Sequence, residues 1–207
     1  MKTLKTGISL LVLVTITGLD VNAQILEKTD GVSQEQFNSC EETLELIPEH
    51  LLEQAEKDKY KVRLCLTDDK KVGTGSLGRT YCDYKYITHN NKTTITEINC
   101  FSYVLADSDV SDIALLHEFG HYIDKISIEK SDKKQVVSKS YEWFNLYNEY
   151  KEQIASYDEL ASVNVYNSSE CFAHCFAIYV SDAEWIKSNC KEVHDFLENR
   201  IELKKEE

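Results

Sequence analysis

The sequence predicts a single α+β domain, with a small mixed sheet near the N-terminus followed by a helical half. Three observations support this class. Alternating apolar and polar residues gather between residues 61 and 98, as expected of strands. From residue 109 onward, apolar residues recur at helical spacing. The chain has one proline, seven glycines and no Pro- or Ser-rich linker, which favours one domain.

The N-terminal segment has the order of a secretory signal peptide. Two lysines give a basic start, the apolar run "GISLLVLVTITGL" follows, and "VNA" offers small residues for cleavage. The apolar run from Ile8 to Leu19 is too short to span a bilayer. We therefore expect a signal peptide at residues 1–23, a single domain at residues 24–207, and a secreted, extracellular protein.

The first half of the domain is expected to hold one helix and the strands. Residues 24–33 are polar and predict a loose lead-in. Between Gln34 and about Lys59 the apolar residues predict one long helix. "KVRLCLT" (residues 61–67) alternates and predicts a strand.

A glycine-rich loop and a hairpin are expected next. "DDKKVGTGSLGRT" (residues 68–80) lacks the spacing and the terminal Lys-Ser/Thr of a phosphate-binding loop, so it carries no nucleotide prediction. "YKYITHN" and "KTTITEI" are rich in strand-forming residues and flank "HNNK", which predicts a hairpin.

Four helices are expected in the second half. The first, "DVSDIALLHEFGHYIDKI", opens with Asp109, Ser111 and Asp112, which suit an N-cap and an acidic first turn. The other three are expected at residues 138–154, 168–180 and 182–204.

The first of these helices carries the motif "HEFGH". On a helix, His117 and His121 lie one turn apart and face the same way, so both imidazoles can hold one Zn²⁺. Glu118 lies where its carboxylate can act as general base toward a zinc-activated water. Gly120 lets another element approach closely. Asp124 is placed to accept the other ring N–H of His121, or is a solvated carboxylate. This pattern is typical of a zincin-like (HExxH) metalloprotease domain.

A third ligand must come from elsewhere, because catalytic zinc uses three protein ligands and "YIDKIS" after the motif holds no histidine. The best source is "NSSECFAHCFAIY" (residues 167–179). Glu170 and His174 lie one helical turn apart there. Spacing favours Glu170, which would complete a His₂Glu set, and leaves His174 open.

The two helices together resemble the catalytic domain of anthrax toxin lethal factor and the related small secreted Pro-Pro endopeptidases. Those proteins share a "HExxHxxD" helix and a later "E-F/Y-FAE-x-F" helix, matched here by "HEFGHYID" and "ECFAHCFAIY". The resemblance covers about residues 61–203. It implies that His117, His121 and Glu170 are the zinc ligands and that Glu118 is the base.

Two positions depart from the pattern of that family. The second Glu of "FAE" is His174 here, which we expect to support the ligands or to alter the coordination. The family places a tyrosine seven residues before the ligand Glu, as a donor to the developing oxyanion, and that position is Val163 here. Tyr166 is the expected substitute, with Tyr157 as an alternative. Without any such donor, turnover would be about 10²–10³-fold slower.

All seven cysteines follow the expected signal peptide, and an oxidising compartment favours disulfides, with one thiol left over. Cys171 and Cys175 are interpreted as small core residues or as partners of Cys190, with a redox-sensitive site as the alternative. The sequence also holds sequons at Asn91 and Asn167. We expect Asn167 to be unmodified, because a glycan there would crowd the site.

These observations predict a secreted zinc endopeptidase that binds one Zn²⁺ and hydrolyses a protein or peptide substrate. An extended substrate would pair with an edge strand near Tyr84 to Thr88. The alternative is a secreted binding or effector protein that keeps the zincin fold with impaired catalysis, as Val163 and His174 allow. The net charge of −13 repels phosphates and anionic lipid, so we expect no nucleic-acid or membrane partner. We also expect a monomer.

Overall fold

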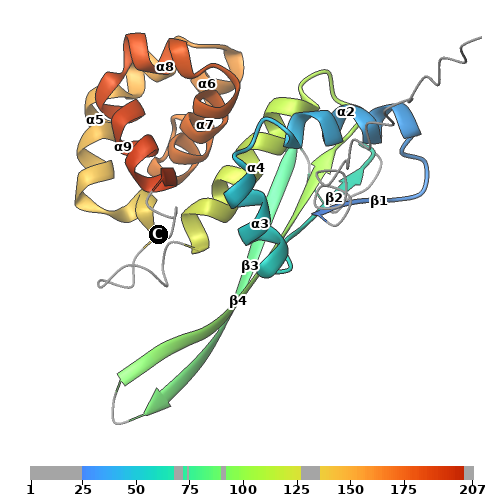
Figure 1. Ribbon diagram of the computed structural model, residues 1–207. Coiled ribbons are helices and arrows are strands. Elements are labelled where there is room, and N and C mark those ends of the chain that lie inside the picture. Colours follow the sequence, from blue (N-terminus) through green and yellow to red (C-terminus); the bar gives the residue numbers. More distant parts are fainter. Residues whose placement is uncertain (1–24, 68–71, 74, 90–91, 127–135, 203–207) are drawn as a thin grey trace, which may run out of the picture.

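A central helix, α4 (Ser111–Ile126), lies between a mixed sheet and a group of C-terminal helices (Figure 1). The computed structural model describes residues 25–67, 72–73, 75–89, 92–126 and 136–202. The expected signal peptide and the sequon at Asn91 lie outside the described residues. The α+β class and the mixed sheet are confirmed.

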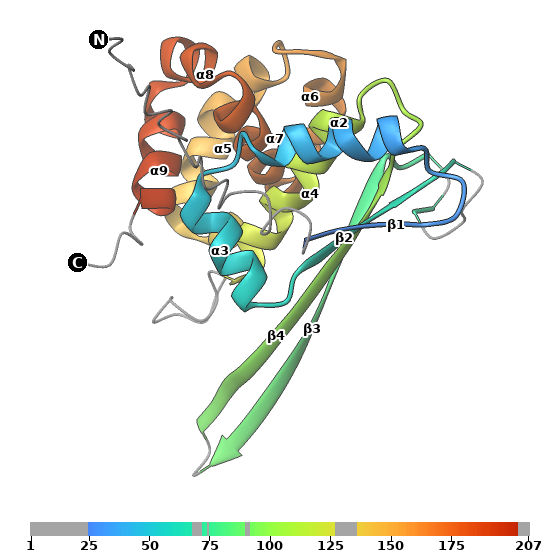
Figure 2. The ribbon, with the colours of Figure 1, turned by 45° about the vertical axis from the view of Figure 1, so that its right-hand side comes forward.

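Four strands form the sheet in the order β1-β2-β4-β3, so β3 is an edge strand. Their bounds are β1 Leu26–Lys28, β2 Lys61–Cys65, β3 Gly78–His89 and β4 Lys92–Leu105. The pairs β1–β2 and β2–β4 are parallel, and β3–β4 is antiparallel. The far part of the β3–β4 hairpin extends away from the helices (Figures 1 and 2). A disulfide joins Cys82 to Cys100, which are direct partners in this hairpin.

The sheet is larger than the sequence pattern predicts. Strand β1 lies in the segment predicted as a loose lead-in, where Ile25 and Leu26 are buried in the core. Strand β3 begins at Gly78, inside the predicted glycine-rich loop, because its first residues pair with β4. In both places tertiary pairing overrides a weak local preference.

The single helix predicted between Gln34 and Lys59 is wrong. The structure has two helices, α2 (Gln34–Leu44) and α3 (Glu49–Lys57). The break comes at Pro48, which is the N-cap residue of α3. A proline disfavours helical backbone in the residue before it, so the first helix ends ahead of this point.

The C-terminal helices confirm the helical half but are more numerous than the three expected after α4. They are η2 (Val137–Lys139), α5 (Tyr141–Ile154), α6 (Glu159–Asn164), α7 (Ser168–Ser181), α8 (Ala183–Asn189) and α9 (Lys191–Glu202). Helix α6 was not predicted, because six residues are too few to show a helical period. The predicted last helix is divided at Cys190, the C-cap residue of α8. Within the described part of the chain, no helix has both the length and the apolarity needed to cross a membrane.

Helices α4 and α7 pack closely, and this contact brings the site together. A Cβ at Gly120 would lie 2.7 Å from the carbonyl oxygen of Ala173 and 2.9 Å from its Cα, so only glycine permits this approach. The rings of Phe119 and Phe176 stack across the contact, with centroids 5.9 Å apart. The close approach expected at Gly120 is therefore confirmed.

Candidate metal centre and active site

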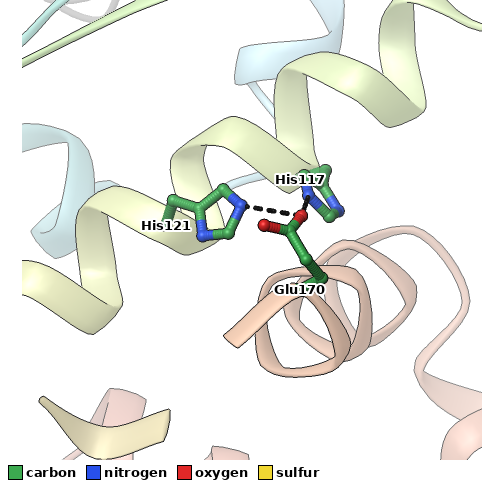
Figure 3. A group of neighbouring side chains, drawn as sticks. All are labelled: His117, His121 and Glu170. Atoms are coloured by element: carbon green, nitrogen blue, oxygen red, sulfur yellow. Dashed lines mark hydrogen bonds and ion pairs between the residues drawn. The ribbon is translucent and has the colours of Figure 1, made fainter. Parts of the chain in front are cut away.

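Two histidines from α4 and one glutamate from α7 converge on a single point (Figure 3). Nε2 of His117 lies 3.1 Å, and Nε2 of His121 3.2 Å, from the same Oε2 of Glu170. One ligand atom of each residue lies within 4.8 Å of the other two. A His₂Glu donor set is one that catalytic zinc sites use, and its convergence fits one metal ion.

The N-terminus of α7 is fixed so that Glu170 faces the histidines. Oδ1 of the N-cap Asn167 accepts hydrogen bonds from the backbone N–H groups of Ser169 and Glu170, at 2.9 and 3.0 Å. Nε1 of Trp143 donates to the carbonyl of Ser168 at 2.9 Å. These contacts place Glu170 in the first turn of the helix. The expectation that Asn167 carries no glycan stays a prediction.

The electrostatics of the cluster favour a charged carboxylate. Burial opposes the ionised form of Glu170, but hydrogen bonds with His117 and His121 outweigh it and hold the pKa of Glu170 well below its usual range. Burial likewise opposes the charged form of His121, yet Glu170 and Glu118 raise its pKa above the ordinary value. A metal ion bound at His121 would therefore displace a proton from that ring, which makes binding weaker at low pH.

Glu118 lies beside the cluster and is almost completely buried, with 5% of its surface exposed. Burial raises the pKa of Glu118, although the charges of His117 and His121 oppose the shift. Its Oε2 accepts a hydrogen bond of 2.5 Å from Oγ1 of Thr80 on β3. A carboxylate with a raised pKa is suited to take up and return a proton near neutral pH.

A cleft of about 610 Å³ opens onto these residues. Residues 75–80 line one side of it, and Val163 and Tyr166 line the other. Both Val163 and Tyr166 are exposed, at 63% and 69%. Tyr157, by contrast, packs against Trp185 with ring centroids 4.7 Å apart. Of the two tyrosines considered for the oxyanion, Tyr166 is therefore the one beside the cleft.

The strand segment expected to pair with substrate is not the part of β3 that lines the cleft. Tyr84 to Thr88 belong to the edge strand, as predicted, but the segment that lines the cleft is residues 75–80. The pairing of an extended peptide with this edge stays a prediction.

Asp124 is fully buried and joins three elements. Its carboxylate accepts hydrogen bonds from the backbone N–H and the hydroxyl of Ser138, at 2.8 and 2.7 Å, and from the hydroxyl of Ser169 at 3.4 Å. Asp124 therefore fastens α4 to η2 and α7, and the alternative of a solvated carboxylate is wrong. The expected hydrogen bond to His121 stays a prediction.

His174 lies behind His117, with ring centroids 5.9 Å apart, and none of its surface is exposed. The side-chain amide of Asn164 donates to Nδ1 of His174 at 3.1 Å, which places the ring proton on Nε2. This Nε2 lies 3.6 Å from the Asp158 carboxylate. Burial, together with the charge of His117, lowers the pKa of His174 to about 4, so the ring is neutral at physiological pH. Glu170, rather than His174, is the residue that faces the two histidines.

The cysteines near the site behave as core residues. Cys171, Cys175 and Cys190 are buried with free thiols, so the bridge considered between these helices is not formed here. Burial raises the pKa of Cys175 well above its ordinary value and that of Cys190 to about 11. Because the thiolate is the reactive form, the redox-sensitive interpretation loses support.

Two comparisons with known proteins bear on this arrangement. A family model described as "Anthrax toxin lethal factor, N- and C-terminal domain" matches residues 20–199. The solved structure of the Pro-Pro endopeptidase PPEP-2 from Paenibacillus alvei is similar, with a TM-score of 0.57 and 15% sequence identity. The likeness covers 86% of this chain and 98% of that one, and at this identity it concerns the fold. The comparison with curated proteins returned no match. By the extent of the family match, the chain belongs to the anthrax toxin lethal factor family.

Proposed function

We propose that this protein is a secreted, monomeric zinc endopeptidase with a zincin-like domain at residues 24–207. One observation carries the proposal: His117 and His121 direct Nε2 at one oxygen of Glu170, with Glu118 beside them on the same cleft. The lethal factor match and the fold shared with a Pro-Pro endopeptidase suggest a metallo-endopeptidase.

Each residue of the site has a role in this proposal. His117, His121 and Glu170 hold the metal. A zinc ion in such a site supplies Lewis-acid activation of water. Glu118 takes a proton as the water attacks the peptide carbonyl and returns it to the leaving amine. Tyr166, on the cleft, donates a hydrogen bond to the developing oxyanion.

In this proposal Asp124 and His174 hold the metal-binding residues in position without binding the metal. Asp124 ties the helix that carries both histidines to the first turn of α7, through Ser138 and Ser169. His174 packs behind the ring of His117 as a neutral group. Contacts of this kind orient metal ligands without touching the metal themselves.

The substrate in this proposal is an extended protein or peptide segment. It pairs with the start of β3 near residues 75–80 and crosses the cleft above α4. Arg79 and Lys125 line the cleft together with Glu118 and Glu170, so its walls carry both signs of charge. Secretion is supported by the signal-like N-terminus and by the Cys82–Cys100 disulfide, which persists in oxidising compartments.

A second candidate is a secreted binding or effector protein with impaired catalysis. Val163 favours it, because this residue lines the cleft at the position where the family resemblance implies the oxyanion tyrosine. The two candidates differ in one respect, namely whether Tyr166 and Glu118 sustain turnover.

The experiment measures zinc and peptide cleavage together. We expect the purified protein to hold one zinc per chain and to cleave members of a peptide library. Glu118→Gln should keep the zinc and lose about 10²–10⁴-fold in kcat, since the carboxylate no longer exchanges a proton. Glu152→Gln, an exposed position on α5, is the matched control.

Three results would change the conclusion. If the wild-type protein binds zinc but cleaves peptides no faster than Glu118→Gln does, the result favours the binding or effector protein. If the wild-type protein binds no zinc, both the proposed metal site and the proposed enzymatic activity are wrong. If Tyr166→Phe cleaves as fast as wild type, another group supplies the oxyanion donor, because losing it should cost about 10²–10³-fold.

A further inference from the structure

Three hydroxyl groups, two of them buried and the third on the cleft, form a continuous hydrogen-bonded chain that ends on the carboxylate of Glu118. The hydroxyl of Tyr60 lies 2.6 Å from that of Ser102, which lies 2.6 Å from that of Thr80. The Thr80 hydroxyl in turn lies 2.5 Å from Oε2 of Glu118. Tyr60 and Ser102 are 1% and 0% exposed. We call Tyr60, Ser102 and Thr80 the hydroxyl relay.

The relay crosses the molecule from the sheet to the site. Tyr60 immediately precedes β2, Ser102 lies on β4, and Thr80 lies directly opposite Ser102 on β3. Tyr60 is itself fixed, because its ring stacks on that of Tyr122 at a centroid distance of 4.2 Å. The relay therefore connects Glu118 on α4 to three parts of the sheet region.

The chemistry of the end group sets the direction of the hydrogen bonds. An ionised carboxylate only accepts, so Thr80 donates to Glu118. A hydroxyl has one proton, so Thr80 must then accept from Ser102, and Ser102 from Tyr60. The backbone carbonyl of Glu118 is the competing acceptor, at longer distances of 3.1 Å from Thr80 and 3.5 Å from Tyr60. All three protons of the relay thus point along the chain toward Glu118.

Gly78 acts on the same carboxylate by leaving space for it. A Cβ at position 78 would lie 2.6 Å from both Cγ and Oε1 of Glu118, closer than real Cβ contacts allow. Gly78 and Thr80 are two apart on β3, so they face the same side of the strand. Gly78 therefore leaves space for the Glu118 side chain, and Thr80 donates a hydrogen bond to its Oε2.

A purely structural role does not require this arrangement. Buried hydroxyls are costly unless each is hydrogen-bonded, and apolar side chains of similar size would fill the space between sheet and helix. The relay instead satisfies three hydroxyls in series, and it ends on a carboxylate that lies beside the cluster of His117, His121 and Glu170.

We propose that Thr80 and Gly78 are positioning residues for Glu118, and that Ser102 and Tyr60 fix the direction of the Thr80 hydroxyl. The proposal rests on the function of Glu118 as general base. Holding Oε2 with a donor leaves Oε1 as the oxygen that exchanges the proton. A base misplaced by about 1 Å can cost 10²-fold in rate, so fixing one oxygen matters for turnover.

The first test compares substitutions at position 80. Thr80→Val keeps the size and removes the donor, and we expect kcat to fall about 10–10²-fold with KM and zinc content unchanged. Thr80→Ser restores the donor and should stay within a few-fold of wild type. Thr88→Val, an exposed position near the far end of the same strand, is the matched control. Gly78→Ala should reduce kcat as Thr80→Val does, because the new methyl group displaces the carboxylate.

A second measurement does not depend on turnover. The effects of Thr80→Val and Glu118→Ala on the unfolding free energy of metal-free protein should be strongly non-additive, because each substitution removes one partner of the same hydrogen bond. If the wild type cleaves nothing, the proposed function fails while this coupling still reports on the relay. Additive effects would overturn the relay, and so would a Thr80→Val enzyme with wild-type kcat. Equal losses of kcat in Thr80→Val and Thr80→Ser would show that only packing matters there, which would also overturn it.

Discussion

The two helices that build the site, α4 and α7, are supported from opposite sides. Glu118 of α4 is held from the sheet, through the hydroxyl of Thr80. The first turn of α7 is held from the helical half. Nε1 of Trp143 donates to the backbone carbonyl of Ser168, and the Ser168 hydroxyl donates to the backbone carbonyl of Ser138. Glu118, the proposed general base, and Glu170, the proposed third ligand, therefore depend on different layers, and a substitution in one layer should spare the residue held by the other.

Asp124 and Gly120 are two residues of α4 that contact α7 directly. Asp124, on α4, accepts hydrogen bonds from Ser138 and Ser169, at the start of the helical half and in the first turn of α7. Gly120, also on α4, contacts the backbone of α7 directly. These two positions set the relative placement of the helices, whereas Thr80 and Trp143 each fix one helix alone.

The largest expected effect separates the two candidate ligands on α7. Glu170→Gln removes the carboxylate that both histidines face, so zinc affinity should fall by more than about 100-fold. His174→Gln should cost about 10-fold or less, because His174 acts only through packing on His117. Competition with a chromophoric chelator measures both values. Equal losses for the two variants would show that His174 also coordinates the metal.

The next expected effect, of comparable size, is on the stability of the fold at acid pH. Burial lowers the pKa of folded His174 to about 4 from an ordinary value of 6.5, so only the unfolded chain accepts a proton between these values. The contribution of the neutral ring is complete above pH 6.5 and is lost as the pH falls to about 4. It amounts to on the order of 3 kcal/mol.

Urea unfolding of the metal-free protein checks this window. The difference in unfolding free energy between wild type and His174→Gln should shrink as the pH falls from 6.5 to 4, because the variant lacks the titrating ring. Parallel curves over this range would show that His174 is not held neutral by its surroundings.

The contrast between α4 and α7 also explains what the sequence could predict. His117, Glu118 and His121 were found from spacing alone, because a helical turn brings them together without help from the rest of the chain. Glu170 was found because its own helix carries a second recognisable pattern. In both cases the chemistry is local to one element.

Thr80 and Gly78 were missed for the opposite reason. They lie in a segment predicted as a loop, and they reach Glu118 only because β3 pairs with β4 beneath α4. The partners of Asp124 are likewise set by the packing of η2 and α7. The break at Pro48 could have been predicted, since the proline itself marks it.

The smallest expected effect tests the contact that couples the two helices. In an isolated helix, Gly120→Ala would be stabilising by about 1 kcal/mol, because alanine is the better helix former. Here the new Cβ would lie 2.7 Å and 2.9 Å from the carbonyl oxygen and Cα of Ala173, which belong to the backbone and cannot rotate away. We therefore expect the sign to reverse, with a loss of about 1–3 kcal/mol in unfolding free energy. Zinc affinity should fall too, because His117 and His121 would move away from Glu170, while the Thr80 contact, which lies on the sheet side of α4, stays in place. A gain in unfolding free energy would show that the two helices can move apart without cost. Gly120 would then not couple α4 to α7, and Asp124 alone would do so.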